Sequence, residues 1–178
     1  MLFEHKLKFG VPIKSDKRIK DVEPITGATS NSVTKEEIPK IVEEPCCQVC
    51  LDLFDKNIRT LDSGCNKLFS NTAYVIISYD GLDLKNKLVA QKLIRDNKAK
   101  LLKIQDVGAH WGEDALRIEV ACSPEDLVFD VSQKLRGAFA EFKKQKLIEF
   151  NPQKRNEWLR EMGAIQSFPN PDFGGVRR

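Results

Sequence analysis

The 178-residue chain lacks several features that often reveal a protein's function at first reading. No apolar run approaches the ~20 residues needed to cross a bilayer, and the longest, around residues 74–77, has only the length of a strand. The first six residues mix acidic and basic side chains, where a secretion signal would place a basic patch and then an apolar stretch. We therefore expect a soluble cytoplasmic protein without membrane contact.

Histidine is scarce, and phosphate-binding loops are missing. The chain has two histidines, His5 and His110, which leaves few candidates for histidine-dependent catalysis. No glycine-rich phosphate loop follows an expected strand, which lowers the odds of a nucleotide-dependent enzyme. We expect no cofactor and assign no metal ligand.

Charge of one sign is also lacking over most of the chain. The formal net charge is only +3, too small to indicate a polyanion-binding protein by itself. Residues 134–178 carry ten Lys or Arg against five Asp or Glu. Attraction to an acidic partner is therefore expected in this C-terminal quarter.

The five cysteines do not have the spacing of a disulfide framework, and a chain of this length needs no covalent staples. Cys46, Cys47 and Cys50, with Cys65 further on, offer only one close-spaced pair toward a zinc site. Cys46 and Cys50 fall on the apolar stripe of an expected helix, where cysteine packs as a small hydrophobe. We favour reduced, packed thiols, with a metal site as the alternative.

Apolar periodicity predicts an α+β fold between residues 39 and 150. The expected helices span about 45–57, 84–97 and 123–146, and the expected strands span 58–62, 73–80, 100–105, 115–121 and 147–150. The order from residue 73 onward is β-α-β-β-α-β, typical of a ferredoxin-like split βαβ core. We therefore expect an antiparallel sheet of four to five strands with helices mainly on one face. An irregular extension, 1–38, precedes this domain, and a helix and tail, 151–178, follow it.

Three local patterns refine this prediction. Residues 63–66 read as a turn, and Asn57 suits a left-handed helix end. A Ser-Pro-Glu-Asp run at 123–126 predicts the start of a helix. The apolar stripe of the helix at 84–97 is expected to contain Leu84, Leu88, Val89 and Leu93.

A thiol enzyme is one functional hypothesis. Cys65 falls in the predicted turn, an exposed place suited to a nucleophile. His110 would act as its base, oriented by Asp114 or Asp106. This arrangement would give a cysteine-dependent hydrolase or transferase.

Two binding hypotheses compete with the enzyme. Trp111 lies in a glycine-flanked loop, and tryptophan is favoured at interface anchors. A basic and aromatic stretch further on would suit a nucleic-acid backbone; its candidate contacts are Lys143, Lys144, Lys154, Arg155 and Trp158.

The leading hypothesis is non-catalytic binding to another protein or to a second copy of the chain. It follows from the missing catalytic motifs, from Trp111, and from polar extensions that could reach a partner. Nucleic-acid binding is the weaker of the two binding hypotheses because the overall charge is low.

Overall fold

The fold is an α+β arrangement around one antiparallel sheet, seen in a computed structural model that describes residues 16–25, 34–66, 71–104 and 112–149. The strands are β1 (Thr60–Asn66), β2 (Thr72–Ser78), β3 (Lys100–Leu102) and β4 (Ala115–Ala121). Their order in the sheet is β1-β2-β4-β3, and all neighbours are antiparallel. The predicted α+β class and antiparallel sheet are confirmed.

The connection from β2 to β3 passes through helix α3 (Leu84–Arg95), and β4 lies between these two strands. The predicted strand at 147–150 is wrong for its described part, since residues 147–149 form no strand. The place beside β2 is taken by β1, which precedes β2 in the chain and pairs with it from Thr60 to Asn66.

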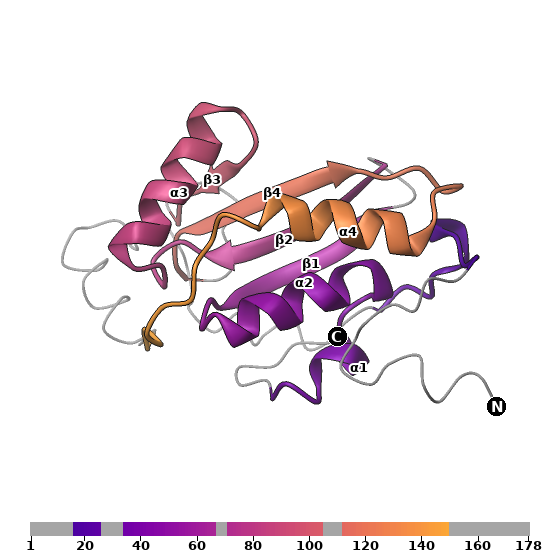
Figure 1. The fold of residues 1–178 in the computed structure, drawn as a ribbon, viewed down its shortest axis with the longest axis horizontal. Helices are drawn as coiled ribbons and strands as arrows, with labels where there is room; N and C mark the ends of the chain where they lie inside the picture. The colour runs from indigo at the N-terminus through magenta and orange to yellow at the C-terminus, as the bar shows by residue number, and fades with distance from the viewer. Residues whose placement is uncertain (1–15, 26–33, 67–70, 105–111, 150–178) are drawn as a thin grey trace, which may run out of the picture.

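Helices α2 (Glu44–Asp55) and α4 (Val128–Ala138) lie side by side over the sheet (Figure 1). Beneath them, β2 contributes Ala73, Val75 and Ile77, all fully buried, because alternate residues of a strand point to one face. The predicted limits of α2 are confirmed, and Asn57 after it has the expected positive φ of 59°. A short helix, α1 (Ile38–Ile41), precedes α2.

Helix α4 is shorter than the sequence predicts at both ends. It begins at Val128, not at Ser123, because residues 123–126 form a turn in which the Ser123 amide donates to the Asp126 carboxylate at 2.8 Å. It ends at Ala138. Residues 143–145 then have no regular secondary structure, and the backbone groups of Lys143 and Gln145 bond to Asn86 and Lys56.

The described part of the N-terminal extension joins the fold at this turn. The amides of Ile19 and Lys20, in the short 3₁₀ helix η2 (Ile19–Asp21), donate to the carbonyls of Asp126 and Pro124, each at 2.9 Å. Ile19 is fully buried in the core. These contacts explain why Ser123–Asp126 serves as a docking turn and not as a helical turn.

The predicted turn at residues 63–66 is wrong, because these residues form the second half of β1. Gly64 pairs with Tyr74, whose ring lies within 3.2 Å of the position that a Cβ on Gly64 would occupy. Two β1 amides donate to carboxylates: Cys65 to Glu43 at 2.7 Å and Ser63 to Asp62 at 2.8 Å. The glycine that suggested a turn instead makes room for the tyrosine of the next strand.

Helix α3 lies apart from the α2 and α4 pair, near β3 (Figure 1). Its limits agree with the prediction, and so does the burial of Leu93, with Val89 partly buried against the core. The other half of the predicted apolar stripe is wrong. Leu84 and Leu88, expected in the core, are 75% and 57% exposed. The buried residues are Asn86, Ala90 and Leu93, because the Asn86 side chain bonds to the chain after α4 and turns this side of the helix inward.

None of the helices formed by the described residues is long and apolar enough to cross a membrane.

Candidate functional site

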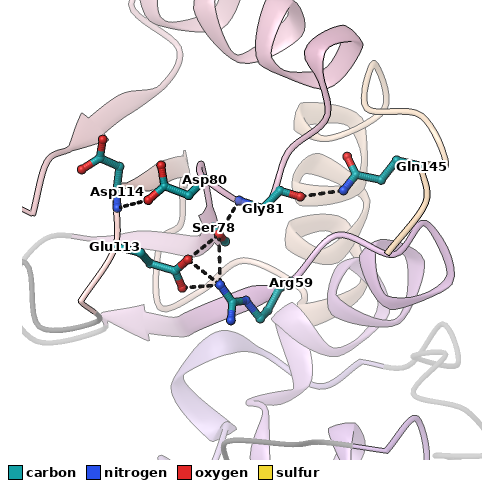
Figure 2. Close-up of polar contacts among 7 residues, drawn as sticks. All are labelled: Arg59, Ser78, Asp80, Gly81, Glu113, Asp114 and Gln145. Carbon is teal, nitrogen blue, oxygen red and sulfur yellow. Dashed lines mark hydrogen bonds and ion pairs between the residues drawn. The ribbon is translucent and has the colours of Figure 1, made fainter. Parts of the chain in front are cut away.

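A buried polar cluster lies where β2 ends and β4 begins (Figure 2). The Glu113 side chain is only 1% exposed and forms an ion pair with Arg59, whose Nη2 lies 2.6 Å from Glu113 Oε1. Ser78 is fully buried and donates from Oγ to Glu113 Oε2 at 2.7 Å. A buried carboxylate is tolerated because it has a cationic partner and a hydrogen-bond donor.

Gly81 connects this cluster to the rest of the fold. Its amide donates to Ser78 Oγ at 2.8 Å, and its carbonyl accepts from Gln145 Nε2 at 2.6 Å (Figure 2). A Cβ at position 81 would lie 2.9 Å from Ser78 Oγ, closer than real Cβ contacts allow. A residue other than glycine would therefore force Ser78 to move.

Gln145 extends the connection to helix α3. Its Oε1 accepts from the Asp83 amide and from Asn86 Nδ2, each at 2.9 Å. Asn86 in turn receives the Lys143 amide on Oδ1 and donates to the Lys143 carbonyl. We call this continuous set the Gly81 network; its members are Arg59, Ser78, Gly81, Asn86, Glu113 and Gln145.

The Gly81 network connects separate segments of the chain and offers few groups that could take part in a reaction. Ser78 is the only hydroxyl in it, and its oxygen is engaged by Gly81 and Glu113 beneath a surface that solvent does not reach. A nucleophile must meet its substrate, so a fully buried serine in this position is a structural residue. Sequence reasoning missed the network because Gln145 and Asn86 lie in segments of ordinary helical composition, and their burial depends on contacts distant in the sequence.

Cys65 lies in β1 and not in an exposed turn, and it is 8% exposed. Its sulfur lies 3.3 Å from that of Cys122, just after β4. The hydrogen bond with Cys122, together with burial, raises the pKa of the Cys65 thiol well above its usual value. Little thiolate forms at neutral pH, which works against a nucleophilic role. His110 lies outside the described residues, and the hypothesis of a Cys65 and His110 pair therefore stays a prediction.

The other cysteines pack in the interior, as predicted for Cys46 and Cys50. Burial raises the pKa of Cys47 and of Cys50 to about 12. Burial likewise raises the pKa of Cys46. Among the described residues, no group of three His, Cys, Asp or Glu side chains is placed to hold a metal ion.

The remaining predicted site residues are spread along the chain. Asp114, proposed to orient His110, instead receives the Ile104 amide on its carboxylate at 2.9 Å, while its own amide donates to Asp80. Lys143 and Lys144 are exposed, in a segment without regular secondary structure and not at the end of a helix. Trp111, Lys154, Arg155 and Trp158 lie outside the described residues.

The outer side of α3 has a different character from the Gly81 network. Leu84 and Leu88 are one helical turn apart, so their side chains share a face, and they are among the most exposed large apolar residues of the described chain. Arg95 falls on the same side by helical spacing and is exposed. We call Leu84, Lys85, Leu88, Lys92 and Arg95 the α3 outer surface.

No family model, no curated protein and no solved structure matches the chain. The α3 outer surface and the Gly81 network are therefore the features from which a function is argued.

Proposed function

We propose that the protein is a non-catalytic binding domain that associates with another protein or with a second copy of itself. The observation that carries this proposal is the exposure of Leu84 and Leu88, at 75% and 57%, on an ordered helix. Exposed apolar side chains that share one face are favoured at protein interfaces, where contact removes them from water. The closed Gly81 network and the buried thiols offer no comparable site for chemistry.

We infer that the sheet is a variant of the ferredoxin-like arrangement, with its helices mainly on one face. The position of β4 between β2 and β3 supports this, as does the contact of α2 with α4. In this variant β1 occupies the edge that the predicted strand at 147–150 would have taken. A cytoplasmic location is supported by five free cysteines.

The Gly81 network supports binding through its effect on α3. The bonds of Asp83 and Asn86 to Gln145 fix the first turn of the helix against the chain that follows α4. A fixed helix loses little conformational entropy when a partner docks on it, which favours affinity. A contribution of Trp111, which lies outside the described residues, stays a prediction.

Site-specific photocrosslinking tests the proposal. A benzophenone amino acid replaces Leu88 in the full chain, expressed in the cells that make the protein, and the same substitution at Lys134, exposed on α4, is the control. We expect a discrete adduct from position 88 and none from position 134. An adduct at twice the 20.2 kDa mass of the chain indicates self-association, and another mass indicates a partner. No adduct, or the same adducts from both positions, would contradict the proposal.

A further inference from the structure

The α3 outer surface carries charge of one sign around its leucines. Between Leu84 and Arg95 the helix has four basic residues and no acidic one. Lys92 lies 3.3 Å from Glu141, and Lys87 lies 5.6 Å from the centre of the Tyr79 ring. The structure shows no ion pair between Lys85 or Arg95 and any described residue, and both are exposed.

The chain that follows α4 adds more positive charge beside this helix. Lys143, Lys144 and Lys146 are all exposed, and the segment is fixed to α3 through Asn86 and Gln145. Leu147 and Ile148, 67% and 39% exposed, continue the same segment. Exposed apolar side chains and cations thus lie together in two adjacent segments, and the exposed acidic residues of the second segment are Glu141 and Glu149.

This positive charge distinguishes between the two partners that the proposed function leaves open, a second copy of the chain and another protein. In a symmetric dimer the same patch meets itself, so Lys85 and Arg95 of one copy would face the cations of the other. Like charges brought together across an interface cost free energy and suppress the wrong partner. The α3 outer surface therefore disfavours a second copy and favours an acidic protein.

We infer that the α3 outer surface binds an acidic amphipathic segment of another protein, most simply a helix with leucine-like residues on one side and carboxylates beside them. The inference rests on the proposed function and names the class of partner. Leu84 and Leu88 contact the apolar side of the segment, as in other pairings of amphipathic helices. Lys85 and Arg95 pair with its carboxylates. Exposed leucines would add little to binding a nucleic-acid backbone, which depends on cations.

Fluorescence anisotropy with a designed peptide tests the inference. The probe is a labelled peptide of about 15 residues, close to the minimum length for a helix in water, in which Leu repeats along one side of the helix and Glu flanks the leucines. The control peptide has the same composition in scrambled order. We expect the full-length protein to bind the patterned peptide and not the scrambled one.

The variants separate the apolar contribution from the charged one. We expect Leu84→Ser with Leu88→Ser to abolish measurable binding, and Lys85→Glu with Arg95→Glu to weaken it about tenfold or more while reducing its salt dependence. Lys134→Glu on α4 makes the same kind of charge change outside this surface and should leave the affinity unchanged. Circular dichroism and urea unfolding of each variant confirm that it is folded.

Parallel titrations with anionic phosphatidylserine vesicles and with a single-stranded oligouridine separate the other classes of ligand. Tighter binding to either one, unaffected by the leucine variant, would overturn the inference, as would equal binding of the patterned and scrambled peptides. A site-specific crosslink at position 88 without peptide binding would overturn the partner class and leave the proposed function standing. The absence of any crosslink would remove the proposed function itself.

Discussion

The two sides of helix α3 show how one element can serve both stability and recognition. On the inner side, Asn86, Ala90 and Leu93 are buried, and the polar group among them belongs to the Gly81 network. On the outer side, Leu84 and Leu88 are exposed. Burying an apolar residue is favourable, whereas burying a polar residue costs free energy that is avoided when it stays in water. Helix α3 does the opposite, since it buries Asn86 and exposes Leu84 and Leu88. Its orientation is therefore set by specific hydrogen bonds and not by hydrophobicity alone.

The largest effect is expected where the inner network holds a charge. Replacing Arg59 with Met removes the cation that pairs with the Glu113 carboxylate, which is 1% exposed. Removing one partner of a buried ion pair lowers the unfolding free energy by about 4 kcal/mol. Urea unfolding measures this loss.

The control is Arg136→Met, which removes a cation from a more exposed pair with Asp52. Surface pairs contribute less than about 1 kcal/mol. Equal losses in the two variants would show that Glu113 is not held as a buried charge.

A smaller difference is expected between two leucines of the same helix. Leu93→Ala removes a side chain that is 6% exposed from the core and should cost about 3 kcal/mol of unfolding free energy. Leu88→Ala removes one that is 57% exposed and should change stability by less than about 0.5 kcal/mol. Thermal or urea unfolding of the pair measures both, and a reversed order would mean that the inner and outer sides are exchanged.

Gln145→Leu tests the link between the network and the helix. Leucine has a similar size but accepts and donates nothing, so the Asp83 amide and the Gly81 carbonyl lose their bonds to Gln145, and Asn86 keeps only its bonds to Lys143. We expect these unsatisfied buried groups to lower the unfolding free energy by about 2 kcal/mol. Hydrogen exchange should accelerate at the Asp83 amide. Unchanged exchange at that amide would show that Gln145 does not fix the start of α3.

The smallest effect concerns the thiols of the interior. With the pKa of Cys47 and Cys50 raised to about 12, and that of Cys65 also raised, the reactive thiolate is rare at pH 7. We expect a disulfide reagent to label all of them slowly in the folded protein, faster as pH rises, and at once in denaturant. If Cys65 alone were labelled rapidly, the result would instead support the hypothesis of a cysteine-dependent enzyme.

The sequence predicts those elements whose signals are local. The helix limits around Pro45 and Asn57 follow from apolar spacing and from a residue that tolerates positive φ. The strand at 115–121 follows from the alternation of Leu116, Ile118 and Val120, and its limits agree with the structure. These patterns act within a few residues and need no knowledge of the fold.

The remaining errors arise from contacts distant in the sequence. Ser123 looks like a helix start, but the N-terminal segment takes the carbonyls of this turn. Gly64 looks like a turn, but it makes room for Tyr74 across the strand pair. Leu84 and Leu88 were expected inside because leucine usually is, while the Lys143 partner of Asn86 lies 57 residues away. No single-sequence signal identifies such a pairing.

The two carboxylates beside β1 bear on how the protein avoids aggregation. Glu43 and Asp62 accept the amides of Cys65 and Ser63, groups that another polypeptide would need in order to add a strand there. The sheet therefore resists growth into ribbons or fibrils along this border even when the protein is concentrated. A polypeptide that adds a strand to β1 would first have to displace these two carboxylates.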